Sequence, residues 1–237
     1  MHKRILLTGS SGGLGLIMAE FLLNEGHFVY LHYHANPSAL ESLCLTYPNQ
    51  TKLLKKNLLI EEELTALFEE TEGVNVLIHA AGVASAGMSW KVSKDEFRRV
   101  NGINYEAPFF VSQLMIPELR KQKWGRIIFF SSVVAQTGIA GTSVYSASKS
   151  ALFGLTRTLA VELAPSGITV NCIAPGYMDE GMIREIPTEM RNEIINKTPI
   201  GSLADSKGIL RMLDMLISED SSAVTGQVFS INGGFQM

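Results

Sequence analysis

Short apolar runs alternate with helical patterns along almost the whole chain. Seven segments have the length and apolar content of buried strands: residues 5–7, 28–31, 52–54, 74–79, 126–130, 168–173 and 228–231. Six others carry apolar residues at helical spacing: residues 14–24, 38–45, 61–70, 94–122, 145–164 and 207–218. We expect an α/β fold, a doubly wound parallel sheet of the Rossmann type with helices on both faces. No repeat or linker breaks the pattern, so residues 1–237 are predicted to form a single domain.

Composition and charge narrow the class of protein. Hydrophobic residues make up 46% of the 237 residues and charged residues 18%, which suits a globular chain with a sizeable core. The net charge of −3 argues against a general affinity for nucleic acid. Cys44 and Cys172 lack metal-ligand spacing, so we expect no metal site and a reducing compartment. The sequence shows no signal-peptide pattern and no apolar run that could cross a bilayer, which predicts a cytoplasmic protein without a membrane partner.

The first predicted strand leads into a glycine-rich turn, Thr8-Gly9-Ser10-Ser11-Gly12-Gly13-Leu14-Gly15. Glycines between a first strand and a first helix let the backbone approach a pyrophosphate, and the helix N-terminus offers it N–H groups. A tight turn without a ligand is the alternative. The turn residues predicted to bind a dinucleotide are Thr8, Gly9, Ser11, Gly13, Leu14 and Gly15.

A second group of residues suggests proton transfer. Tyr145 and Lys149 are four residues apart in a predicted helix, so both side chains share one face. A nearby ammonium favours the phenolate and should lower the tyrosine pKa. Ser132 follows a buried strand, where a hydroxyl can orient a substrate oxygen, while Ser131 should point to the other side. A surface Tyr–Lys pair and an ordinary loop are the alternatives.

Asn104 lies in the middle of the long helical pattern. Pro108 has no N–H and therefore cannot bond to the carbonyl of Asn104, four residues earlier. The free carbonyl could hold a water that carries protons between Lys149 and solvent. A kinked helix without this role is the alternative.

Together these features resemble the short-chain dehydrogenase/reductase superfamily, and most of all its 3-oxoacyl-(acyl-carrier-protein) reductases. The similarity runs from Arg4 to Phe235 and includes Pro175-Gly176 and Asn232-Gly233-Gly234. It implies hydride transfer between a nicotinamide cofactor and a carbonyl or alcohol, with Asn104, Ser132, Tyr145 and Lys149 as catalytic residues. It also implies further cofactor contacts from Asn57, Leu58, Ala80, Ala81, Gly82, Tyr145, Lys149, Pro175 and Gly176.

The end of the second predicted strand bears on the choice of cofactor. It reads His32-Tyr33-His34-Ala35-Asn36 and lacks the carboxylate that usually binds the ribose of NAD. His34 and Asn36, with Ser38, could donate hydrogen bonds to a 2′-phosphate. However, Gly12 stands where many NADPH-dependent relatives carry arginine. We expect NADP(H) rather than NAD(H), while exposed loop residues without a ligand remain the alternative.

The chain departs from the family pattern at three places. His79-Ala80 replaces a pair of asparagines, so hydrogen bonds that steady the sheet are lost, and Glu180 replaces a threonine that often holds the carboxamide. Near the end of the chain, Asn232 also replaces the aspartate of an Asp-Gly-Gly motif. Residues 177–203 show no clear helix or strand pattern, and we expect them either to cover an apolar substrate pocket or to pack as one or two short helices. The apolar residues of that segment are Met178, Met182, Ile183, Ile186 and Met190.

The resemblance implies a small-molecule or acyl-thioester substrate, with acyl carrier protein as a candidate partner. A basic rim would suit that partner, and its candidates are Lys121, Lys123 and Arg126, whereas Ser166 stands where such reductases often carry a basic residue. A homotetramer or homodimer is expected, because the helices carry more large apolar residues than are needed to pack against one face of the sheet. These residues are Phe109, Met115, Leu152, Phe153 and Leu159. An NAD-dependent alcohol or sugar dehydrogenase, and a cofactor-binding regulatory protein without turnover, remain alternatives.

Overall fold

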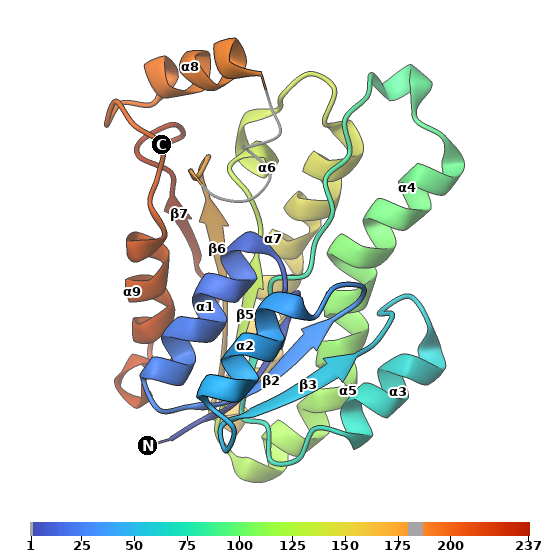
Figure 1. Cartoon of the computed structure of the whole chain (residues 1–237), viewed down its shortest axis with the longest axis vertical. Coiled ribbons are helices and arrows are strands. Elements are labelled where there is room, and N and C mark those ends of the chain that lie inside the picture. Colours follow the sequence, from blue (N-terminus) through green and yellow to red (C-terminus); the bar gives the residue numbers. More distant parts are fainter. Residues whose placement is uncertain (1, 180–186) are drawn as a thin grey trace.

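The computed structural model describes residues 2–179 and 187–237. In these ranges seven strands form one parallel sheet in the order β3-β2-β1-β4-β5-β6-β7 (Figure 1). The strands are β1 (Arg4–Thr8), β2 (Phe28–Tyr33), β3 (Thr51–Lys55), β4 (Val76–His79), β5 (Gly125–Phe130), β6 (Ile168–Pro175) and β7 (Val228–Ile231). The predicted doubly wound α/β fold is confirmed.

Helices cover both faces of the sheet. They are α1 (Gly13–Asn24), α2 (Ser38–Thr46), α3 (Glu61–Glu69), α4 (Lys94–Asn101), α5 (Ala107–Gln122), α6 (Val134–Thr137), α7 (Ser143–Leu163), α8 (Thr188–Lys197) and α9 (Ser206–Ile217). Side chains alternate along each strand, so Leu6 packs with α3, α5 and α7, whereas Ile5 and Leu7 pack with α1, α2 and α9. Because both faces are covered, the central strands β1, β4 and β5 are mainly apolar rather than alternating with polar residues, whereas the edge strand β3 carries lysines.

The helical patterns were located to within one or two residues, but two helices were not located. Four-residue α6 is too short for a periodic pattern, and α8 lies in the segment whose pattern was unclear. Three residues cited for self-association, Met115, Leu152 and Leu159, are buried against the sheet. These three residues belong to the core of the chain, so the prediction that they are left over for contacts between subunits was wrong.

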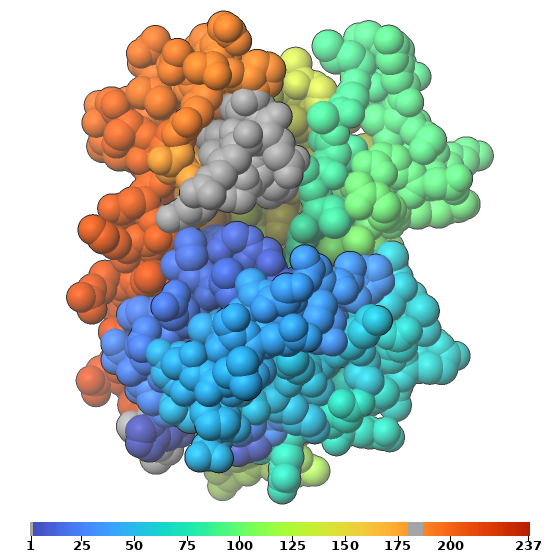
Figure 2. All heavy atoms as spheres, viewed as in Figure 1, coloured from blue at the N-terminus to red at the C-terminus, as the bar shows by residue number. Residues whose placement is uncertain are grey.

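The strand order reverses direction between β1 and β4, and this is the point where doubly wound folds bind ligands at the carboxyl ends of the strands. In Figure 2 the segments of α4 (green) and α8 (orange) project separately beyond the N-terminal part of the chain (blue), at this same edge of the sheet. Within the residues the structure describes, no helix is long and apolar enough to cross a membrane.

Candidate active site

The glycine turn is closely packed at the end of β1. Gly9 has φ +71°, a conformation that favours glycine, and a Cβ there would lie 2.6 Å from Cα of Ala81. A Cβ on Gly15 would lie 2.1 Å from the carbonyl oxygen of Gly9. The first bond of α1 runs from the N–H of Leu16 to the oxygen of Gly12, so the N–H groups of residues 13–15 precede the hydrogen-bonded turns. This arrangement can receive a phosphate.

The turn after β4 closes against the turn after β1. The N–H of Ala81 donates to Oγ1 of Thr8 at 3.2 Å, and the Thr8 hydroxyl donates to the carbonyl of Ile78 at 3.5 Å. These contacts join the predicted cofactor residues of the glycine turn to those of residues 80–82. The structure therefore brings two distant sequence motifs to one place.

His79 forms a side-chain hydrogen bond at the position where the family pattern has asparagine. Its ring stacks on Phe129 at 5.0 Å between centroids, and its Nε2 lies 3.0 Å from Oγ of Ser112. The Ser112 hydroxyl donates to the carbonyl of Pro108, so Nε2 of His79 must donate to Ser112. Burial lowers the pKa of His79 to about 3, and the ring is neutral. Hydrogen bonding between β4 and α5 is thus retained despite the departure from the family pattern.

A buried histidine that sequence reasoning passed over holds the other side of the glycine turn. His32 is 3% exposed, and its Nδ1 accepts the N–H of Gly9 at 3.1 Å. Its Nε2 lies 3.1 Å from the carbonyl oxygen of Lys56, just after β3. The signal in the sequence was a histidine between apolar residues inside a strand, but neither partner is near it in the chain.

Asn104 is completely buried at a change of helical geometry. Residues Gly102–Glu106 form a π-helical segment between α4 and α5, and Pro108 is the second residue of α5. The Asn104 side chain accepts from the N–H of Val83 at 2.8 Å and donates to the oxygen of Val83 at 3.0 Å. It also donates to Oγ of Ser148, which lies between Tyr145 and Lys149. Asn104 therefore joins the loop after β4 to α7.

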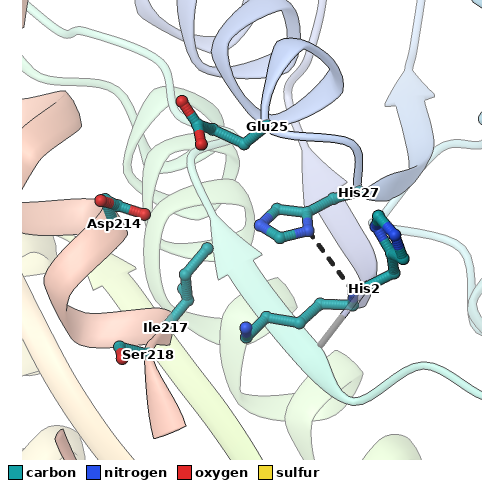
Figure 3. Close-up of a pocket in the computed structure, with 7 residues that line it drawn as sticks. His2, Glu25, His27, Asp214, Ile217 and Ser218 are labelled. Carbon is teal, nitrogen blue, oxygen red and sulfur yellow. Dashed lines mark hydrogen bonds between the residues drawn. The ribbon is translucent and has the colours of Figure 1, made fainter. Parts of the chain in front are cut away.

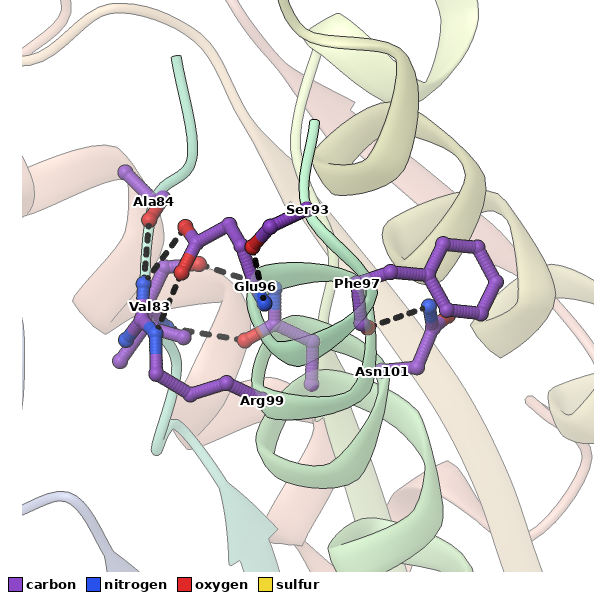
Figure 4. A network of polar contacts seen from close by, with 8 residues as sticks. Val83, Ala84, Ser93, Glu96, Phe97, Arg99 and Asn101 are labelled. Atoms are coloured by element: carbon purple, nitrogen blue, oxygen red, sulfur yellow. Dashed lines mark hydrogen bonds and ion pairs between the residues drawn. The ribbon is translucent and has the colours of Figure 1, made fainter. Parts of the chain in front are cut away.

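The same loop is held a second time by α4 (Figure 4). Ser93 caps the helix by accepting the N–H of Glu96 at 3.1 Å. Arg99 donates to both carboxylate oxygens of Glu96, at 2.8 and 2.9 Å, and to the carbonyl of Ala84 at 3.3 Å. The loop that carries Gly82 is thus held at Val83 by Asn104 and at Ala84 by Arg99.

Lys149 lies in the interior between this loop and β5. Its ammonium donates to the carbonyl of Phe130 at 2.8 Å, and a Cβ on Gly82 would lie 3.1 Å from its Nζ and 3.4 Å from Oδ1 of Asn104. Burial lowers the pKa of Lys149 to about 8, an effect that the nearby Cys172 partly opposes. The ammonium, Gly82 and Asn104 therefore lie together.

Ser132 and Tyr145 also lie close together at the end of β5. Burial raises the pKa of Tyr145, and a hydrogen bond with the Ser132 side chain opposes that rise. We had expected the neighbouring lysine to lower this pKa; burial instead dominates, with the ammonium bonded to a backbone carbonyl. Ser131 points away as predicted and donates to the carbonyl of Lys149 at 2.8 Å. The phenol is therefore protonated at neutral pH.

Pro175 and Gly176 end β6 beside this group. The carbonyl of Pro175 accepts the N–H of Val133 at 2.8 Å, and a Cβ on Gly176 would lie 2.6 Å from Cα of Asn232. The next residue, Tyr177, packs edge-on against Phe235 at 5.4 Å, and its pKa is raised by burial and then by Tyr145. Met178 is buried and Met190 is 53% exposed. Glu180, Met182, Ile183 and Ile186 lie outside the described residues.

The residues predicted to contact the adenosine half are mostly accessible. His34 and Asn36 are exposed after β2, and Oδ1 of Asn36 already accepts both the N–H and the hydroxyl of Ser38. Oδ1 of Asn57 accepts the N–H of Leu59 at 3.0 Å, while Leu58 packs into the core. An amide oxygen can accept two hydrogen bonds, so Oδ1 of Asn57 can accept one more. The cofactor contacts of His34, Asn36, Asn57 and Leu58 stay predictions.

The proposed basic rim near the site is wrong. Arg126 is 1% exposed, stacks on Trp124 at 4.4 Å and donates to the carbonyl of Ser218 at 2.9 Å. Lys121 and Lys123 come before β5, so they lie at the amino edge of the sheet, opposite the candidate site. These residues are close to Ser132 in the sequence, but the whole of β5 separates them from it in space.

The amino edge has a small hollow of its own, of about 290 Å³ (Figure 3). Its lining is His2, Lys3, Glu25, His27, Asp214, Ile217 and Ser218. His27 accepts the backbone N–H of Lys3 at 3.4 Å, and burial lowers its pKa to about 4, with Lys3 adding to the shift. Basic and acidic groups are mixed there and none of the predicted site residues takes part. The carboxyl edge is therefore the candidate active site.

Comparisons with known proteins extend over nearly the whole chain. A family model described as Enoyl-(Acyl carrier protein) reductase matches residues 9–236. The 3-oxoacyl-(acyl-carrier-protein) reductase of Rickettsia felis is 32% identical over 235 residues, covering 99% of this chain and 97% of that protein. The protein of the same name from Aquifex aeolicus is 32% identical over 239 residues, covering 98% and 96%. The crystal structure of the Brucella melitensis 3-oxoacyl-(acyl-carrier protein) reductase aligns with a TM-score of 0.92 at 26% identity, covering 99% and 91%.

Proposed function

Because this chain belongs to the short-chain dehydrogenase/reductase family of oxidoreductases, we propose that it reduces a ketone with NADPH. The favoured substrate is a 3-oxoacyl thioester, which would become the 3-hydroxy product. One observation carries the proposal: Ser132, Tyr145, Lys149 and Asn104 gather at the carboxyl edge, next to a glycine turn fit for a dinucleotide.

The glycine turn fits a bound dinucleotide. Cβ atoms at Gly9 and Gly15 would meet backbone atoms at 2.6 and 2.1 Å, so only glycine lets the turn pack this closely and bring its backbone N–H groups near a pyrophosphate. The N-terminus of α1 would hold its charge through the N–H groups of residues 13–15. When bound, a nicotinamide cofactor supplies the hydride for the reduction.

The four polar residues would handle the proton. The Ser132 hydroxyl would hold the substrate oxygen beside the Tyr145 hydroxyl, which donates the proton. A raised pKa suits a donor, because the phenol carries its proton at neutral pH. The cationic Lys149 would stabilise the phenolate that is left, and Asn104 would hold the loop and the water path through which the proton is replaced.

The cofactor proposal is NADP(H) rather than NAD(H). No carboxylate follows β2, and His34 and Asn36 are exposed where a 2′-phosphate would lie. The substrate proposal rests on the names of the Rickettsia and Aquifex relatives, with acyl carrier protein as candidate partner. Self-association as a dimer or tetramer is supported by the exposed Trp90, Phe97 and Phe110, which lie on or just before the α4–α5 segment. We also propose a cytoplasmic location.

The test is a titration of the purified protein with NADPH and with NADH, followed by nicotinamide fluorescence. A short 3-oxoacyl thioester is then added to the tighter complex, and the loss of absorbance of the reduced nicotinamide is recorded. Tighter binding of NADPH and its oxidation would support the proposal. Preference for NADH would favour an alcohol or sugar dehydrogenase, and binding without turnover of any carbonyl would favour a regulatory protein.

A further inference from the structure

His32 connects the carboxyl ends of three neighbouring strands. Its imidazole extends from β2, accepts the N–H of Gly9 after β1 and meets the carbonyl of Lys56 after β3, each at 3.1 Å. Its own carbonyl accepts the N–H of Ser10 at 2.9 Å. Two successive residues of the glycine turn are therefore held by one residue of the next strand.

The contacts determine which ring nitrogen carries the hydrogen. Both partners are backbone groups whose roles are set, because an N–H only donates and a carbonyl oxygen only accepts. Nδ1 must therefore be the bare nitrogen that accepts from Gly9, and Nε2 carries the hydrogen that goes to Lys56. Burial lowers the pKa of His32 to about 4, which agrees with a neutral ring.

The position of Gly9 matters for the whole turn. A Cβ on Gly9 would be 2.6 Å from Ala81, and its carbonyl oxygen is 2.1 Å from the place of a Cβ on Gly15. Gly9 is thus pressed between the β4 turn and the first turn of α1. A shift of Gly9 would move the N–H groups that precede the first bond of α1.

We propose that His32 is a positioning residue for the dinucleotide, because its Nδ1 holds Gly9 and thereby sets the place of the α1 N-terminus. This inference rests on the proposed function. His32 does not lie among the residues that handle the proton, so it governs cofactor affinity and leaves turnover at saturating cofactor unchanged.

Two variants of His32 separate positioning from a general structural role. In His32→Asn the amide oxygen hangs from Cγ, as Nδ1 does, so it can accept from Gly9, but the bond to Lys56 is lost. In His32→Gln the longer side chain places its amide near the Nε2 position, so it can donate to Lys56, but nothing accepts from Gly9. Each variant loses one bond, which makes each a control for the other.

The measurements are the Kd of NADPH by fluorescence, kcat at saturating NADPH and the Tm of both variants. We expect His32→Asn to bind within about twofold of the parent protein and His32→Gln to bind about tenfold more weakly, about 1.4 kcal/mol, with equal kcat. Equal Kd values of NADPH for the two variants would overturn the inference. It would also be overturned if the loss of NADPH affinity in each variant simply matched its loss of Tm. If the parent protein binds no nicotinamide cofactor, both this inference and the proposed function fail; if it binds and the variants are alike, only this inference fails.

A second measurement needs no variant. Long-range ¹H–¹⁵N NMR spectra of the parent protein should show His32 with its hydrogen on Nε2, and the Nδ1 resonance should move when NADPH is added. A hydrogen on Nδ1, or an Nδ1 resonance that NADPH does not move, would refute the positioning role even if both variants fail to fold.

Discussion

Replacing Gly15 by alanine should displace the glycine turn and weaken cofactor binding. The added Cβ would lie 2.1 Å from the carbonyl oxygen of Gly9, 3.0 Å from its carbonyl carbon and 3.1 Å from Cα of Ser10. All three are backbone atoms, so no side-chain rotation can relieve the contact. The turn itself must move, by roughly 1 Å to reach an ordinary carbon–oxygen separation.

The size of the effect follows from that overlap. Overpacking of a well-packed site costs about 1–3 kcal/mol in the free energy of unfolding. The displaced N–H groups are the ones proposed to hold the pyrophosphate, so a similar loss in binding corresponds to about 10–100-fold in the Kd of NADPH. We expect Gly15→Ala to show both effects while the far side of the sheet keeps its structure.

Gly12→Ala is the matched control in the same turn. Its Cβ would meet only the Gly9 oxygen, at 3.4 Å, and its backbone is extended, with φ −76° and ψ 163°. Fluorescence titration with NADPH and urea unfolding should show Gly12→Ala close to the parent protein. The reasoning is refuted if Gly15→Ala binds NADPH as the parent does, or if the two variants lose affinity equally.

Three other outcomes are expected. Tyr145→Phe should lower kcat by about 10²–10⁴-fold and leave the Kd of NADPH within about twofold, since only the proton donor is lost; equal turnover would contradict its role. Asn104→Ala should lower the free energy of unfolding by about 2–3 kcal/mol, because Val83 loses two hydrogen bonds to this buried side chain, whereas Asn101→Ala, at a half-buried residue that bonds only within its own helix, should change it little in urea melts. Unfolded His27, His32 and His79 take up protons below pH 6.5 that the folded forms resist to about pH 4, 4 and 3, so stability should fall as the pH is lowered through that window. The slope is up to about 4 kcal/mol per pH unit in urea melts at stepped pH, and a flat profile would contradict this.

The sequence allowed the strands and most helices to be located because their signals are local. A parallel sheet then requires every strand to end at the same edge, and Gly9, Gly82 and Ser132 lie together there because β1, β4 and β5 are neighbours. The spacing of Tyr145 and Lys149 placed both on one helix turn. Locating the elements and pairing Tyr145 with Lys149 needed no knowledge of which strands are neighbours.

Contacts between neighbouring strands could not be predicted in the same way. His32 meets Gly9 and Lys56 because β2 lies between β1 and β3, which is a property of strand order. Arginine is usually found at the surface. Arg126 is nevertheless buried, because it donates to the carbonyl of Ser218, just after α9, and stacks on the ring of Trp124. The Tyr145 pKa was misjudged for a related reason, since burial cannot be read from a motif.

The junction of β1 and β4 also has a consequence for synthesis on the ribosome. Leu6 pairs with Leu77 and Thr8 with His79, so the first strand waits for about seventy further residues before its second neighbour is made. Until Ala81 emerges, the glycine turn lacks one of its two walls. Lys149 and Ser131, which complete the interior, come later still. A nascent chain halted near residue 120 could therefore hold the dinucleotide half of the fold, whereas the proton-handling residues assemble only when more than half of the chain has been made.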